Sequence, residues 1–101
     1  MIENNMRPIH PGEILRDEYV LHLGLSANRL AIELRVPVTR LSKILNEERA
    51  VSPDTALRLA RYFGGDAQTW LNLRAAYDLK KAIAEHGADI KNNIRPMSTA
   101  A

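Results

Sequence analysis

The fold is decided by the stretch from residue 27 to residue 45, which reads ANRLAIELRVPVTRLSKIL. Apolar residues recur every three or four positions in both halves, which predicts two short helices joined by a tight turn. Ala31 is the small residue at which the helices cross, and Leu41 and Ile44 follow it on the buried face of the second helix. The turn needs a residue in the left-handed region, and Arg35 stands there instead of glycine, at a cost of about 1 kcal/mol. The stretch therefore predicts a helix-turn-helix unit.

The second of these helices has a polar outer face with basic residues at its edge. In helix-turn-helix proteins the N-terminal half of this helix faces the major groove, where Arg40 and Lys43 can donate to guanine O6 and N7. The start of the first helix, and Arg49 after the second, are placed to contact the DNA backbone. The alternative is that the basic residues only solvate an exposed surface. The predicted DNA-contacting residues are Ser26, Asn28, Arg29, Pro37, Thr39, Arg40, Ser42, Lys43, Asn46 and Arg49.

The segment before this unit predicts one helix from about Pro11 to Leu23. Proline is acceptable in a first turn, and Gly24 fits as the C-terminal cap. Leu15, Tyr19 and Leu23 recur at the spacing of one α-helical face, so we expect all three to face the core.

Two helices follow the unit, and both have clear start signals. Ser52-Pro53-Asp54 combines an N-cap residue, a proline in the first turn and an acid placed against the helix dipole. Asp66 caps the last and longest helix, which we expect to run to His86 before Gly87. With no period-2 strand, the fold class is all-α with five helices. The expected organisation is a flexible arm over residues 1–10, a helical domain over 11–87 and a mobile tail over 88–101.

The last helix has two apolar faces. Trp70, Leu73 and Tyr77 form one, which we expect to join the core. The second face predicts a contact with a partner subunit, because a single small domain can cover only one side of a helix. The alternative is that both faces pack on the first and fourth helices. The residues of this partner face are Ala75, Leu79, Ala82 and Ile83.

Charge supports the expectation of a dimer. The 101-residue chain carries a formal net charge of +2, and ten of its 14 basic residues are arginine, which suits planar recognition of phosphate and base edges. Residues 26–49 hold five basic and three acidic side chains. A monomer that neutralises so few phosphates binds DNA weakly, so useful specificity implies a homodimer on two half-sites about 34 Å apart.

Composition excludes several other classes of protein. The chain has no cysteine, which rules out disulfides, thiolate zinc sites and thiol catalysis and suits the reducing cytoplasm. No apolar run approaches the roughly 20 residues that span a membrane, and the N-terminus does not resemble a secretory signal. The three histidines are scattered, and no catalytic motif, metal-ligand spacing or phosphate-binding glycine loop is present. We therefore expect neither an enzyme nor a bound cofactor or metal.

The chain also resembles HigA-type antitoxins over about residues 7–80. The residues that carry this resemblance are Arg7-Pro8, His10-Pro11-Gly12-Glu13-Ile14-Leu15, Ser52-Pro53, Ala56-Leu57-Arg58-Leu59-Ala60, Phe63-Gly64, Trp70-Leu71-Asn72-Leu73 and Tyr77-Asp78-Leu79. The resemblance implies an Xre-like helix-turn-helix domain related to phage (lambda) repressors. It also implies a dimeric repressor of its own toxin–antitoxin operon, which binds operator DNA and neutralises a HigB-like toxin that cleaves mRNA. Arg35 and Arg74 depart from the family pattern, which often has glycine and glutamine there.

Two other functions fit the same chain. A stand-alone transcriptional regulator has the same fold but no toxin partner. A protein-interaction module has lost DNA binding and works only by capturing a partner.

Overall fold

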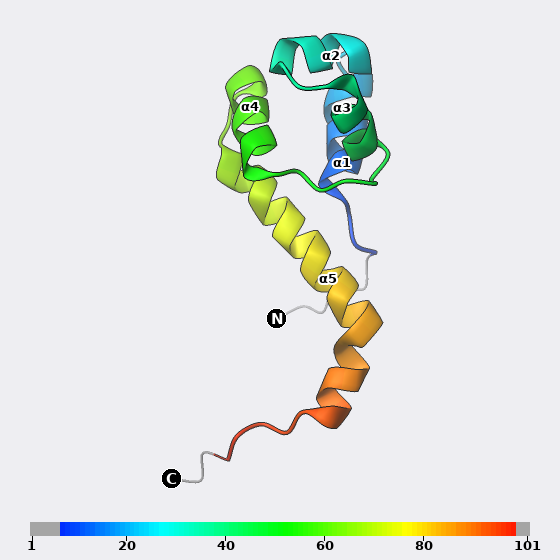
Figure 1. The fold of residues 1–101 in the computed structure, drawn as a ribbon, viewed down its shortest axis with the longest axis vertical. Coiled ribbons are helices and arrows are strands. Elements are labelled where there is room, and N and C mark those ends of the chain that lie inside the picture. The colour runs from blue at the N-terminus through cyan, green and yellow to red at the C-terminus, as the bar shows by residue number, and fades with distance from the viewer. Residues whose placement is uncertain (1–6, 99–101) are drawn as a thin grey trace.

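The computed structural model describes residues 7–98, which form helices joined by short connections (Figure 1). The elements are α1 (Pro11–Ile14), the π-helical segment η1 (Leu15–Leu21), α2 (Ala27–Leu34), α3 (Val38–Leu45), α4 (Pro53–Phe63) and α5 (Ala67–Asn93). No strand occurs in the described part of the chain, so the all-α, five-helix prediction is confirmed.

The predicted starts of α2, α4 and α5 are confirmed by their capping residues. The side chains of Ser26, Ser52 and Asp66 each accept a hydrogen bond from a backbone N–H in the first turn of α2, α4 and α5. Arg35 ends α2 with φ 57° and ψ 45°, the left-handed conformation expected at that position. The turn from α2 to α3 therefore has the predicted geometry despite the missing glycine.

The residues of the first helix that face the core differ in part from the predicted ones. The helix runs on from α1 into η1 and ends at Leu21, and Leu23 is 55% exposed, so the expectation that it faces the core is wrong. A π-helix bonds residue i to residue i+5, which brings positions five apart to one face. Leu15 and Val20 are accordingly both buried, while Tyr19 is half-buried.

The core lies where helices α2, α3 and α4 meet η1 and the start of α5. Ala31 is 3% exposed, Leu41 is fully buried and Ile44 is 1% exposed, which confirms the crossing predicted for α2 and α3. Trp70 is also buried, and its ring centroid lies 5.5 Å from that of Tyr19. Trp70 therefore anchors the N-terminal end of α5 to the domain.

Residues 7–10 of the predicted flexible arm make contacts with the rest of the domain. His10 is 5% exposed, its Nδ1 accepts a hydrogen bond from the Gly12 N–H at 2.8 Å, and its ring lies against Tyr77 of α5. The Arg7 guanidinium pairs with Glu13 at 2.7 Å. The remainder of the predicted arm, residues 1–6, lies outside the described residues.

His10 leads us to expect lower stability in mild acid. Burial lowers the pKa of His10, and the positive charge of Lys81 lowers it further. The negative charges of Glu47 and Asp78 act in the opposite direction but do not offset the effect of burial. The unfolded chain therefore binds the proton first, so the stabilisation is complete above about pH 6.5 and declines as the pH falls through the folded-state pKa. We expect Tm to fall as the pH is lowered from about 7.5 to about 5.5. His10→Asn, whose amide oxygen can accept the same bond without titrating, should show a smaller fall, and an equal fall in both proteins would contradict this role.

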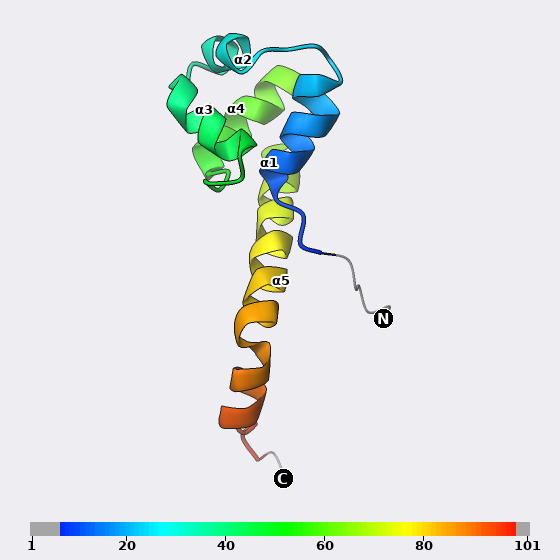
Figure 2. The same cartoon turned by 90° about the vertical axis from the view of Figure 1, so that its right-hand side faces the viewer.

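Helix α5 is longer than predicted. It continues through Gly87 to Asn93, so the expected end at His86 is wrong and the first six residues of the predicted tail are helical. Gly87 does not adopt the positive φ of a helix cap, and a glycine inside a helix costs only about 1 kcal/mol relative to alanine. Beyond its first turns, which pack on the domain, α5 projects away from the other helices as a stalk (Figure 2). The last three residues of the predicted tail, 99–101, lie outside the described part.

Candidate DNA interface

The outer face of α3 is polar and accessible. Thr39, Lys43 and Asn46 are exposed and Ser42 is half-buried, whereas Leu41, Ile44 and Leu45 on the opposite side are buried. The helix is short and begins directly after the exposed Pro37. Its amphipathic pattern thus presents about two turns of hydrogen-bonding side chains on one face, and the major groove of DNA is wide enough to admit such a helix.

Arg40 lies at the edge of this face and is more enclosed than its neighbours. Its side chain is 32% exposed, and its Nη1 lies 3.8 Å from Oδ2 of Asp54 at the start of α4. The Arg40 Nε is buried and has no hydrogen-bond partner among the described residues. The stem of the side chain is therefore packed, and only part of the guanidinium reaches solvent.

The residues predicted to contact the DNA backbone lie at the ends of α2 and α3. Asn28 and Arg29 are exposed in the first turn of α2, and Arg29 pairs with Glu33 at 2.9 Å. The Ser26 hydroxyl accepts from the Arg29 N–H at 3.0 Å, so its own proton remains available for a phosphate oxygen. Arg49 is exposed in the loop after α3. Any phosphate contact of Arg29 must compete with its ion pair.

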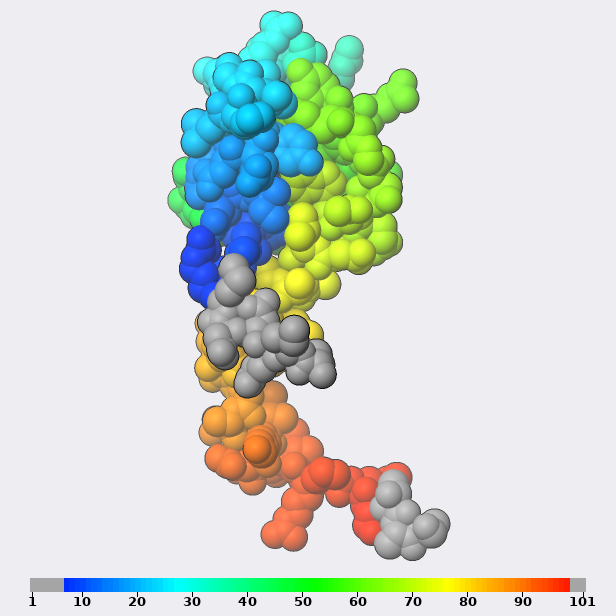
Figure 3. Space-filling model, turned by 180° about the vertical axis from the view of Figure 1, so that it is seen from behind, coloured from blue at the N-terminus to red at the C-terminus, as the bar shows by residue number. Residues whose placement is uncertain are grey.

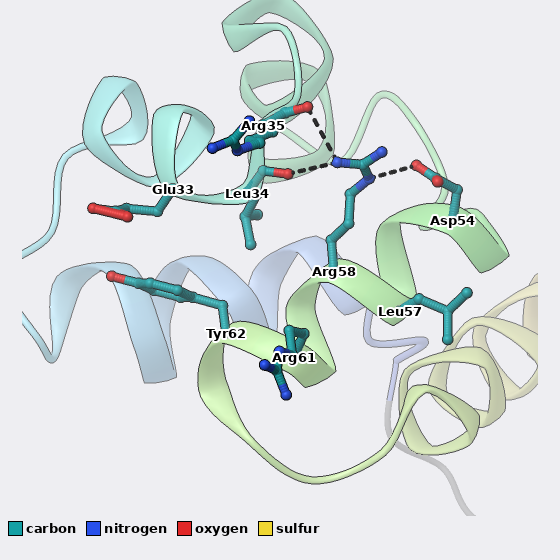
Figure 4. Close-up of a pocket in the computed structure, with 8 residues that line it drawn as sticks. All are labelled: Glu33, Leu34, Arg35, Asp54, Leu57, Arg58, Arg61 and Tyr62. Carbon is teal, nitrogen blue, oxygen red and sulfur yellow. Dashed lines mark hydrogen bonds and ion pairs between the residues drawn. The ribbon is translucent and has the colours of Figure 1, made fainter.

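Three arginines from outside the unit hold the backbone around α2 and α3, and the sequence reasoning missed this role. Arg16 of η1 donates to the Leu45 carbonyl at 2.8 Å, at the end of α3. Arg58 of α4 donates to the Leu34 carbonyl at 2.9 Å, at the end of α2 (Figure 4). Arg74 of α5 donates to the Val51 carbonyl at 3.2 Å. Each guanidinium satisfies a carbonyl that a helix end or loop leaves without a partner. Arg16 thus holds the end of α3 directly, while Arg58 holds the end of α2 and Arg74 holds the loop after α3.

An open groove of about 510 Å³ separates the end of α2 from α4 (Figure 4). Arg58 crosses it, with Leu34 and Arg35 on one side and Leu57 and Tyr62 on the other. The hydrogen bonds of Arg58 thus join the α4 side of the groove to the α2 side.

The predicted partner face is exposed on the stalk of α5. Leu79 is 62% and Ile83 59% exposed, and Ala75 and Ala82 are exposed beside them. The alternative that both faces of α5 pack within the domain is wrong. The space-filling view shows the second half of α5 standing clear of the domain (Figure 3). Ile90, which is 52% exposed, continues the apolar surface beyond Gly87, and the prediction missed it because it placed the helix end there.

Other kinds of site find little support within residues 7–98. That part of the chain holds no group of three or more acidic or histidine side chains arranged to bind a metal ion. None of its helices is both long and apolar enough to cross a membrane.

Known proteins of similar sequence and structure share this architecture. A family model described as helix-turn-helix matches residues 17–70, more than half of the chain. Virulence-associated protein I of Dichelobacter nodosus is 54% identical over 99 residues, which cover 98% of this chain and 90% of that protein.

Two solved structures of proteins with DNA resemble this chain in both sequence and fold. The antitoxin HigA of Pseudomonas aeruginosa, solved with the higBA promoter, is 44% identical with a TM-score of 0.88, over 91% of this chain and all of that one. The antitoxin GraA in complex with its operator is 41% identical with the same TM-score, over 98% of this chain and all of GraA. The chain therefore belongs to the helix-turn-helix family of DNA-binding regulators, in the group that includes the HigA-type antitoxins.

Proposed function

We propose that this protein is the antitoxin of a HigBA-type module, a cytoplasmic homodimer that represses its own operon and neutralises an mRNA-cleaving toxin. The observation that carries the DNA-binding part is the outer face of α3, where Thr39, Arg40 and Lys43 lie together on a helix whose last carbonyl accepts a hydrogen bond from Arg16 of η1. Two relatives of the same fold were solved with operator or promoter DNA, which supports the same use of this face.

The dimer follows from the amount of DNA that one copy can contact. One α3 reads only a few base pairs, and two copies related by a two-fold axis read half-sites one helical turn apart. The partner face of Ala75, Leu79, Ala82 and Ile83 offers the apolar surface that such a dimer needs.

The dimer predicts the behaviour of a charged double variant. We expect Leu79→Asp/Ile83→Asp to shift the protein from dimer to monomer in sedimentation equilibrium, because two carboxylates per copy would face each other across an apolar contact. Operator affinity should fall about tenfold or more, since the two half-sites would no longer be bound as one unit.

The matched control is Leu21→Asp/Leu23→Asp, which alters two leucines that are 67% and 55% exposed at the end of η1 and in the turn after it. It should leave the dimer intact. A wild-type protein that sediments as a monomer would contradict the dimer itself. A charged variant that stays dimeric would show that the dimer contact lies elsewhere on the molecule.

Toxin neutralisation is tested first by looking for a small RNase-like reading frame beside this gene, whose absence would favour a stand-alone regulator, and then by co-expression with the product of that frame. We expect the wild-type chain to restore growth and to co-purify with that toxin. Arg40→Ala/Lys43→Ala should restore growth equally well, because both substitutions lie on the proposed DNA-reading face. Failure of both proteins to relieve toxicity would favour a stand-alone regulator, whereas relief together with no operator binding by the wild type would favour a capture module.

A further inference from the structure

The side chain of Asp54, at the start of α4, lies between Arg58 of the same helix and Arg40 of α3, and Figure 4 shows its bond to Arg58. Its Oδ2 accepts a hydrogen bond from Arg58 Nε at 2.9 Å and lies 3.8 Å from Arg40 Nη1. Arg58 in turn donates to the carbonyls of Leu34 and Arg35, at 2.9 and 3.3 Å. The carboxylate is therefore held in place from the end of α2, and it faces the arginine of α3.

We propose that Asp54 is a positioning residue for Arg40 and contributes to operator discrimination through it. The proposal rests on DNA reading by α3. Arg40 has a packed stem with a buried Nε, and the carboxylate attracts one side of its guanidinium. These contacts limit the directions in which the remaining N–H groups can point.

The unpartnered Nε is the second observation behind this assignment. A buried donor without an acceptor is unfavourable, and native proteins retain few such groups. Arg40 keeps this arrangement at the edge of the proposed reading face, where a fixed guanidinium is useful. Such a local cost is typical of a side chain held for function and not for stability.

Positioning affects specific and non-specific DNA differently. A bidentate contact with a base edge requires one orientation of the guanidinium, so prior restraint reduces the entropy lost on binding. Attraction to phosphates depends mainly on charge and tolerates many orientations. Removal of the restraint should therefore weaken operator binding while non-specific binding stays constant or increases.

The test compares Asp54→Asn with wild type on the protein's own upstream DNA and on a scrambled duplex. Asparagine keeps an oxygen that can accept from Arg58, and thermal unfolding confirms the fold of each variant. We expect the affinity ratio of the two duplexes to fall about five- to 150-fold, the range for two immobilised side chains, one in each copy of the dimer. In an Arg40→Ala background, Asp54→Asn should leave the ratio unchanged. Glu48→Gln, which makes the same charge change at an exposed position, should raise both affinities alike.

A second measurement needs no DNA. We expect ¹⁵N relaxation of the Arg40 side-chain Nε–Hε group to show a restrained group in the wild type and a mobile one in Asp54→Asn. Equal mobility in both proteins would overturn the proposal even if operator recognition is established, as would an unchanged affinity ratio. If the wild type fails to distinguish the two duplexes, the proposed function fails, and the relaxation data still decide whether Asp54 restrains Arg40.

Discussion

Gly12→Ala is expected to destabilise the protein by about 3 kcal/mol and to lower Tm by about 10–20 °C. An added Cβ at this position would lie 1.8 Å from the carbonyl oxygen of Ile44 and 2.9 Å from its carbonyl carbon. The obstacle is the backbone of α3, which cannot rotate away as a side chain can. Either α1 or α3 must therefore move. Thermal unfolding followed by circular dichroism measures the effect.

The matched control for this substitution is Gly87→Ala. Gly87 also lies in a helix, but its added Cβ would meet only the Ile83 side chain, at 3.3 Å for the nearest atom. We expect Tm to stay the same or to rise slightly, because alanine favours a helix interior by up to about 1 kcal/mol over glycine. Equal losses of stability in both variants would contradict the close approach of α1 and α3 as the cause.

The central unit could be predicted from the sequence because its signals are local. The spacing of Ala31, Leu41 and Ile44 specifies how two helices cross, and the cap residues Ser26 and Ser52 mark where helices begin. These features depend on neighbouring residues and on the period of the helix, and the structure confirms them. The turn at Arg35 was predicted in the same way, because only a left-handed residue can close it.

The errors arose where distant contacts override a local pattern. The π-helical segment η1 changes the periodicity after Leu15, so Val20 and not Leu23 turns inward. Gly87 was expected to end α5, but glycine only weakens a helix, and the flanking residues continue it. His10 looked like part of an arm because its contact with Tyr77 joins residues 67 positions apart. No local motif encodes such a contact.

The exposed residues of the candidate site could be predicted from the sequence. The side chains that hold them in position could not. Thr39, Lys43 and Asn46 could be assigned from the polar face of one helix. The roles of Arg16 and Arg58 depend on carbonyls 24 to 29 positions away along the chain. The proline and acid after Ser52 were recognised as a helix start, and the contact of Asp54 with Arg40 appeared only in three dimensions.

The second large expected effect is the loss of operator binding in Arg40→Ala/Lys43→Ala. Each of these side chains can donate to a guanine edge, and a dimer presents two copies of both. At about 1 kcal/mol for each of four lost contacts, operator affinity should fall about 1,000-fold. Affinity for a scrambled duplex should fall much less, because only charge is lost there. Arg61→Ala/Lys91→Ala removes the same charge from exposed positions on α4 and α5 and should retain operator recognition.

Fluorescence anisotropy on the protein's own upstream DNA and on a scrambled duplex, at two salt concentrations, tests the proposed function most directly. The wild type should bind its upstream DNA tightly, and that preference should disappear in Arg40→Ala/Lys43→Ala while Tm remains near that of the wild type. Equal, weak and strongly salt-dependent binding of the wild type to both duplexes would contradict operator recognition by α3.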